Sequence, residues 1–214
     1  MSAIVAEHAS KSIKGRVVLN DISFTLESGG IYGFFGVNGS GKSMLFRAIS
    51  GLIKLDSGTI SVFGKRIGVD ISFPEDMGLA LGAWFWDDYS GFENLKMLAS
   101  IRGIASDEDV RLAIARLGLD PGDDRPYKAY SLGMRQRLEL AQAIMEKPKL
   151  LILDEPTNAL DASGLDLVVN IIKEERDRGA TILLTAHNVK ELEALCNRSF
   201  ELIDGSLRDV ASGI

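Results

Sequence analysis

The sequence has little of what secreted, membrane-spanning or nucleic-acid-binding proteins usually contain. Its 214 residues include one cysteine, Cys196, so an internal disulfide is excluded and a reducing compartment is favoured. No stretch approaches the roughly 20 apolar residues that span a bilayer. The N-terminus lacks the basic start and apolar core of a secretory signal. The net charge of −6 argues against a general nucleic-acid binder. We therefore expect a soluble cytoplasmic protein.

What is present is an ordinary globular composition, 46% hydrophobic and 25% charged, at a length that fits one domain. Residues 16–26 have the pattern of a strand pair. Further strands are predicted at 31–35, 59–63, 78–81, 150–153, 181–185 and 200–203, and helices at 42–50, 92–101, 107–117, 134–145, 165–178 and 189–196. Alternating strands and helices predict an α/β fold with a parallel sheet covered on both faces, interrupted by a mostly helical block.

A glycine-rich loop at residues 36–43 matches the phosphate-binding pattern G-x-x-x-x-G-K-[ST], between a predicted buried strand and a predicted helix. The glycines allow successive N–H groups to face phosphate oxygens, and the helix N-terminus adds partial positive charge. Lys42 is expected to reach the β- and γ-phosphates, and the Ser43 hydroxyl to bind Mg²⁺. The predicted ATP-binding residues here are Gly36, Val37, Asn38, Gly39, Ser40, Gly41, Lys42, Ser43 and Met44.

Two acidic residues, Asp154 and Glu155, follow the buried strand 150–153. Ligands of open α/β sheets lie at the carboxyl ends of the strands, where these side chains emerge. Asp154 is expected to help hold Mg²⁺, and Glu155 to polarise a water for in-line attack on the γ-phosphate. Alone, such a strand usually just enters a solvated loop. Together with residues 36–43 it predicts ATP hydrolysis.

Three further motifs make the chain resemble the ATP-binding subunits of ABC transporters. Residues 130–137, Tyr-Ser-Leu-Gly-Met-Arg-Gln-Arg, resemble the signature motif in the variant found in bacterial drug and peptide (bacteriocin-type) exporters. Residues 158–161 resemble the D-loop, and His187 matches the switch histidine. The resemblance covers about residues 16–207. It implies one domain over 1–214: a P-loop NTPase core of the ABC ATPase type (1–82 and 134–214), with an N-terminal antiparallel β subdomain and a small helical subdomain inserted at about 83–133.

The resemblance also implies how such a subunit works. Glu155, His187 and Lys42 would be catalytic, with Asp161 in the D-loop. Two chains would enclose two ATP molecules, so the signature residues would face the ATP of the opposite subunit; they are Ser131, Leu132, Gly133 and Met134. Ser131 also has the pattern of a helix cap.

The implied partners are a separate transmembrane permease and a second ATPase subunit, identical or different, at the cytoplasmic face of the membrane, with no nucleic acid. The implied function is ATP-powered export of a drug, peptide or similar small molecule. The alternatives are an ABC ATPase without a transport role, and a nucleotide-dependent regulator or immunity component with weak hydrolysis.

Two positions depart from the family pattern. Ile13 stands where an aromatic residue usually stacks on adenine, which removes a stacking contribution of about 1 kcal/mol. Gly82 stands where a glutamine usually touches Mg²⁺ and the attacking water. The chain's two glutamines, Gln136 and Gln142, both lie in the signature helix. One candidate substitute for the missing side chain is Asp87.

The aromatic triplet 84–86, Trp-Phe-Trp, directly follows this junction. In the resembling family, this stretch lies beside the groove that receives a short helix of the membrane subunit, and aromatic residues are enriched at interface hot spots. The alternative is that the triplet packs in the helical subdomain's own core. We expect Phe85 to point inward and a tryptophan outward.

Overall fold

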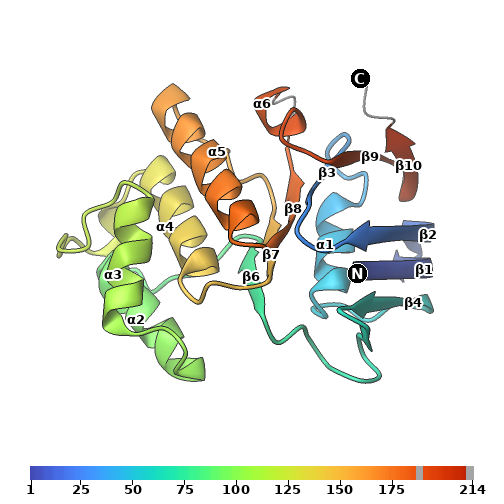
Figure 1. Cartoon of the computed structure of the whole chain (residues 1–214), viewed down its shortest axis with the longest axis horizontal. Coiled ribbons are helices and arrows are strands. Elements are labelled where there is room, and N and C mark those ends of the chain that lie inside the picture. The colour runs from blue at the N-terminus through green and yellow to red at the C-terminus, as the bar shows by residue number, and fades with distance from the viewer. Residues whose placement is uncertain (187–189, 211–214) are drawn as a thin grey trace.

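Two β-sheets organise the chain, and the larger one positions the glycine-rich loop. The protein is described by a computed structural model that covers residues 1–186 and 190–210. The larger sheet has six strands in the order β10-β9-β3-β8-β7-β6, and every neighbouring pair is parallel except β9 and β10 (Figure 1). Its strands are β3 (Ile31–Phe35), β6 (Met77–Ala80), β7 (Leu150–Leu153), β8 (Thr181–Thr185), β9 (Arg198–Ile203) and β10 (Ser206–Val210). This arrangement confirms the predicted parallel sheet, to which β10 is an unforeseen addition.

The smaller sheet is antiparallel, in the order β2-β1-β4-β5. Its strands are β1 (Ser2–Ile13), β2 (Arg16–Glu27), β4 (Ser57–Val62) and β5 (Lys65–Arg66). The prediction of a strand pair within residues 16–26 is wrong, because this segment is one strand whose partner is β1. Lys14 and Gly15, with φ of 50° and 79°, form the two-residue connection that suits the twist of a hairpin.

Six α-helices and one 3₁₀ helix accompany the sheets in the part of the chain that the structure describes. They are α1 (Lys42–Ile49), α2 (Gly91–Arg102), α3 (Asp107–Arg116), η1 (Tyr127–Ala129), α4 (Leu132–Ile144), α5 (Ala162–Asp177) and α6 (Lys190–Glu193). Ser90 and Glu93 form a capping box at the start of α2. The predicted starts of α4 and α5, at 134 and 165, are late because Ser131 and Asp161 are the residues that cap these helices.

The parallel sheet separates two apolar clusters. Ile182 and Leu184 of β8 face the cluster shared with α4 and α5, whereas Leu183 between them faces the cluster shared with α1 and the antiparallel sheet. In the second cluster, Phe34 stacks on Phe200 at 5.0 Å between ring centroids. Both faces of the sheet are therefore covered, as the apolar strands predict. The helices α2 and α3 extend the first cluster away from the sheet (Figure 1).

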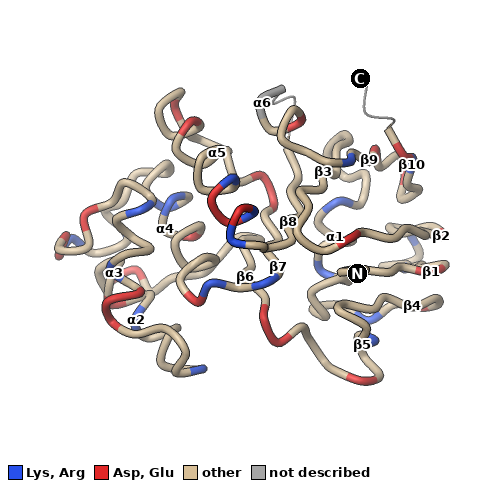
Figure 2. Tube along the Cα trace, viewed as in Figure 1, with Lys and Arg blue, Asp and Glu red and all other residues tan. Residues whose placement is uncertain are grey.

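Charged residues are interspersed along both the helical and the sheet-forming parts of the chain (Figure 2). No helix within residues 1–186 and 190–210 has the length and apolar character that crossing a membrane requires.

Candidate functional site

The glycine-rich loop joins the end of β3 to the start of α1, as the sequence predicts. Gly36 and Gly41 have φ of 142° and 114°, in the region that favours glycine. A Cβ atom on Gly36 would lie 2.4 Å from the Leu202 carbonyl oxygen, and one on Gly41 would lie 2.5 Å from the Val18 carbonyl oxygen. The neighbouring strands thus approach the loop so closely that these two positions accept only glycine.

The loop holds polar groups where an anion would bind. Lys42 is 5% exposed, and its Nζ donates to the carbonyl oxygens of Gly36 at 2.6 Å and Val37 at 3.1 Å. Ser40 is buried, and its Oγ has no hydrogen-bond partner among the described residues. Gly41, the N-cap of α1, offers no side chain to the first-turn N–H groups. A buried ammonium, a buried hydroxyl and uncapped N–H groups form a site suited to phosphate.

Asp154 lies beside this loop, at the end of β7, and links three elements. Its Oδ2 accepts a hydrogen bond of 2.6 Å from the Ser43 hydroxyl of α1. Its Oδ1 accepts one of 2.6 Å from the Thr185 hydroxyl of β8. The carboxylate and the Ser43 hydroxyl are the oxygen ligands that Mg²⁺ prefers, so this pair fits the ion. Thr185 is a residue that the sequence reasoning missed.

Glu155 follows with φ of 52°, an uncommon conformation for a residue other than glycine. Its N–H donates to the Thr185 hydroxyl at 2.9 Å, and its Oε2 accepts from Asn158 Nδ2 at 2.8 Å. Strained backbone of this kind is found more often at functional sites. Glu155 lines the same cleft as the loop residues Lys42 and Ser43.

A cleft of about 430 Å³ brings most of these groups together, and its volume is typical of small-molecule sites. Its lining residues are Ile13, Arg16, Val18, Asn38, Gly39, Gly41, Lys42, Ser43, Met44 and Glu155. Ile13, at the end of β1 and 39% exposed, therefore lines the same cleft as Lys42 and Ser43. Of the other predicted loop residues, Val37 is 75% exposed and Ser40 is buried beneath the loop.

The signature residues lie outside the lining of this cleft. Ser131 caps α4, its Oγ accepting from the Met134 N–H at 3.2 Å, and Leu132 is 69% exposed. Gly133 lies near the D-loop, since a Cβ atom there would be 3.2 Å from the Ala159 carbonyl oxygen. Ser131 and Leu132 are exposed, whereas Met134 is half-buried and packs against the apolar cluster beneath α4 and α5.

The two remaining predicted residues are Asp161 and His187. Asp161 caps α5 through the Gly164 N–H at 2.8 Å, and this bond, followed by one from Ser163, lowers the pKa of the Asp161 carboxyl. His187 lies outside the described residues.

The junction at Gly82 contains a carboxylate that the sequence reasoning missed. Glu139 of α4 accepts hydrogen bonds from the Gly82 N–H at 2.6 Å and the Ala83 N–H at 2.9 Å. Next along the chain, Phe85 packs edge-on against Tyr127, with ring centroids 5.2 Å apart, whereas Trp84 is 94% exposed. The inward Phe85 and outward tryptophan are as predicted.

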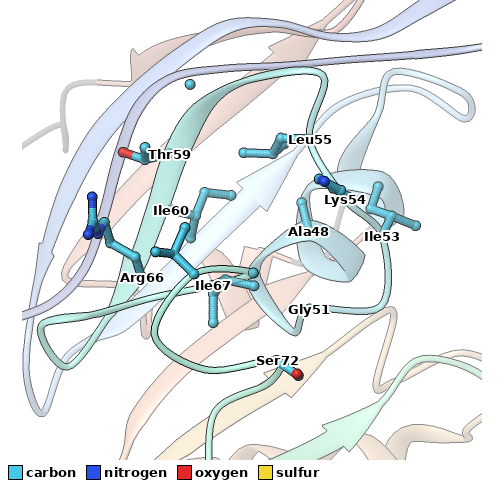
Figure 3. Close-up of a pocket in the computed structure, with 13 residues that line it drawn as sticks. Ala48, Gly51, Ile53, Lys54, Leu55, Thr59, Ile60, Arg66, Ile67 and Ser72 are labelled. Atoms are coloured by element: carbon cyan, nitrogen blue, oxygen red, sulfur yellow. The ribbon is translucent and has the colours of Figure 1, made fainter.

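A separate cavity of about 320 Å³ lies between the C-terminal end of α1 and the strand β4. Figure 3 shows Ala48, Leu55, Ile60 and Ile67 around it, with Arg66 at its edge. None of its lining residues lines the cleft of the glycine-rich loop. Glu155 and the loop residues Lys42 and Ser43 line the other cleft.

Comparison with known proteins identifies the family. The family model described as ABC transporter matches residues 19–158. This chain belongs to the ABC transporter ATP-binding family. The ABC protein YybJ of Bacillus subtilis (strain 168), named an uncharacterised ABC transporter ATP-binding protein, is 47% identical over 199 residues, which cover 92% of this chain and 91% of YybJ. The lantibiotic transport ATP-binding protein SrtF of Streptococcus pyogenes is 33% identical over 199 residues, covering 89% of this chain and 82% of SrtF.

The fold is also that of an ABC ATPase. A solved ATP-binding cassette, described as a dimer in a post-hydrolysis state with ADP and Pi, superimposes with a TM-score of 0.88 at 19% identity, over 99% of this chain and 100% of that one. The predicted ABC ATPase fold is thereby confirmed. As a member of this family, the chain is an ATPase subunit of a transporter.

Proposed function

We propose that this ABC ATPase powers the export of a drug, peptide or similar small molecule through a separate transmembrane permease. The observation that carries ATP hydrolysis is the convergence of Lys42, Asp154 and Glu155 on one edge of the parallel sheet. The export direction rests on the motif at residues 130–134, which resembles that of bacterial exporters, and on the similarity to SrtF, a protein named for lantibiotic transport.

The chain's own groups divide the work of phosphoryl transfer. Lys42 and the N–H groups of the loop bind and neutralise the phosphates of ATP. Ser43 and Asp154 would hold Mg²⁺, which supplies further positive charge against the phosphate oxygens. Glu155 orients a water for in-line attack on the γ-phosphate and accepts its proton. Thr185 forms hydrogen bonds with both acidic residues and fixes their position relative to each other.

A second ATPase subunit completes the site in this proposal. None of the four signature residues lines the cleft of its own chain, and the exposed N-terminus of α4 suits contact with the phosphates of a nucleotide on the opposite subunit; the four are Ser131, Leu132, Gly133 and Met134. We propose a homodimer, or a heterodimer with a related subunit, in which Asp161 lies near the subunit boundary and His187 contacts the γ-phosphate.

The permease would bind the helical subdomain, residues 83–133, which we propose is inserted between core segments 1–82 and 134–214. Trp84 and Trp86, 94% and 49% exposed, supply aromatic surface beside its first residues. Such surface is typical of protein interfaces. Binding there would hold the ATPase at the cytoplasmic face of the membrane.

The test is ATP turnover with Mg²⁺ by the wild-type protein and by Glu155→Gln, with and without a permease that co-purifies with the wild-type protein. We expect the variant to bind ATP but to lose turnover by about 100-fold or more, the size of a general-base contribution. Glu174→Gln, at an exposed glutamate of α5 paired with Arg116, is the matched control. A wild-type protein without turnover, even in the presence of the permease, contradicts the proposal.

A regulator or immunity component with weak hydrolysis is the second candidate, favoured by Ile13 and Gly82, the two departures from the family pattern. An ABC ATPase without a transport role is a third. Submicromolar ATP affinity with negligible turnover would favour the regulator, and turnover that the permease leaves unchanged would favour the third.

A further inference from the structure

Two consecutive backbone N–H groups, those of Gly82 and Ala83, converge on one side chain. Both donate to Oε1 of Glu139, at 2.6 and 2.9 Å. Gly82 has φ of +86°, a conformation in which a side chain is strained. Successive N–H groups arranged in this way form a small anion-binding concavity. The carboxylate that fills it comes from the middle of α4, the helix that Ser131 caps.

This turn lies next to the catalytic edge of the sheet. Ala80, the last residue of β6, pairs with Leu153 of β7, and its carbonyl oxygen accepts from the Asp154 N–H at 2.8 Å. Gly82 follows two residues later. Burial raises the pKa of the Glu139 carboxyl, the Gly82 and Ala83 N–H groups oppose this rise, and the charge of Asp154 adds to it. Glu139 therefore lies within the electrostatic reach of Asp154.

The other end of the same segment is held by a second buried side chain. Asn94 of α2 is fully buried, its Oδ1 accepts from the Trp86 N–H at 2.7 Å, and its Nδ2 donates to the Trp86 carbonyl oxygen at 3.0 Å. Residues 82–86, the tryptophan segment, are thus tied to α4 at one end and to α2 at the other. Between the two ties, Trp84 projects into solvent.

We propose that Glu139 is a positioning residue that couples the nucleotide site to the tryptophan segment. Gly82 has no side chain to place at the catalytic edge, so the link between this edge and the segment runs through the backbone that Glu139 holds. Binding of ATP with Mg²⁺ beside Asp154 changes the charge around Glu139. This alters the hydrogen bonds from Gly82 and Ala83 to Glu139, and Trp84 and Trp86 move relative to α4. This inference rests on the proposed function, in which Ser43 and Asp154 hold Mg²⁺ and ATP.

The chain contains two tryptophans, and both lie in the tryptophan segment. Intrinsic tryptophan emission therefore reports on this segment alone. Titration with ATP and Mg²⁺ in a Glu155→Gln background separates binding from hydrolysis. We expect a saturable emission change that Glu139→Ala largely abolishes, while the ATP affinity stays close to that of the parent. Glu139→Gln, which keeps the accepting oxygen, should retain most of the change.

Turnover supplies the second readout, in proteins with Glu155 intact. We expect Glu139→Ala to lower kcat by about 10-fold, at the low end of what the loss of a group supporting a metal site costs, with little change in KM. Gln142→Ala, which removes another half-buried polar side chain one turn along α4, is the matched control and should leave both readouts near wild type. Should Glu139→Ala not fold, Glu139→Asp replaces it, because its shorter carboxylate reaches one N–H group at most.

Three results would overturn the inference. The first is that Glu139→Ala and Glu139→Asp both keep the emission change of the Glu155→Gln parent and the kcat of wild type. The second is that Gln142→Ala loses as much of both readouts as Glu139→Ala does. The third is that ATP binds to the Glu155→Gln parent without changing its tryptophan emission. A wild-type protein that shows no transport or no ATP turnover would contradict the proposed function alone. The emission titration requires ATP binding and does not require hydrolysis.

Discussion

Replacing Thr185 by valine removes a hydroxyl that bonds both acidic residues of the site, at nearly constant shape. Thr185 is fully buried at the end of β8. Its hydroxyl donates to the Asp154 carboxylate at 2.6 Å and accepts from the Glu155 N–H at 2.9 Å. A hydrogen bond to a charged group contributes about 1.5–3 kcal/mol, and a buried N–H left without a partner costs about 1–3 kcal/mol. We therefore expect valine to lower the free energy of unfolding by about 3 kcal/mol.

For a chain of this length, 1 kcal/mol corresponds to about 2–4 °C in Tm, so Thr185→Val should melt roughly 6–12 °C below wild type. The assay is thermal unfolding followed by circular dichroism at neutral pH without nucleotide. Thr185→Ser is the control, since it keeps the hydroxyl and loses one methyl group, at a cost of about 1 kcal/mol. A valine variant that melts within about 2 °C of wild type, or above the serine variant, would refute the reasoning.

Two further predictions address pH dependence and base binding. The Lys147 ammonium, then Ser106, holds the pKa of Asp109 well below its usual value, so its stabilisation is present at neutral pH and fades as pH falls below about 4. Asp109→Asn should therefore lower Tm at pH 7, with a gap that closes in acid; a constant gap contradicts this. Ile13→Tyr should tighten ADP binding about fivefold through stacking, measured calorimetrically; unchanged affinity beside an Ile13→Leu control would place the base elsewhere.

The grouping of the glycine-rich loop with the two acidic residues was predictable because its parts are local in sequence. Residues 36–43 form one continuous motif, and Asp154 and Glu155 follow directly on a strand of four buried apolar residues. The rule that ligands lie at the carboxyl ends of parallel strands then joins two segments 111 residues apart. The hydrogen bond of 2.6 Å between Ser43 and Asp154 is the contact that this rule requires.

The first strand was missed for the opposite reason. β1 is long, but its pairing with β2 is interrupted by register shifts, and His8, with φ of 51°, lies within one of them. A bulge of this kind moves the following side chains to the other face, so apolar and polar residues no longer alternate along the strand. Because this alternation is broken, residues 2–13 do not have the pattern of a strand. The sequence pattern therefore predicts both strands of the pair within residues 16–26, which belong to β2.

Glu139 was hidden for a third reason, which concerns the type of partner rather than the distance. A glutamate between Leu138 and Leu140 on a helix reads as a solvated position, because periodicity registers only side chains. Its partners are backbone N–H groups 57 and 56 residues earlier, and every residue except proline has such a donor. From the sequence, Gly82 reads as a lost polar contact at the catalytic edge. In the folded chain the Glu139 carboxylate binds the backbone at Gly82, where the family's glutamine side chain is missing. The junction therefore keeps a polar side chain, which α4 supplies.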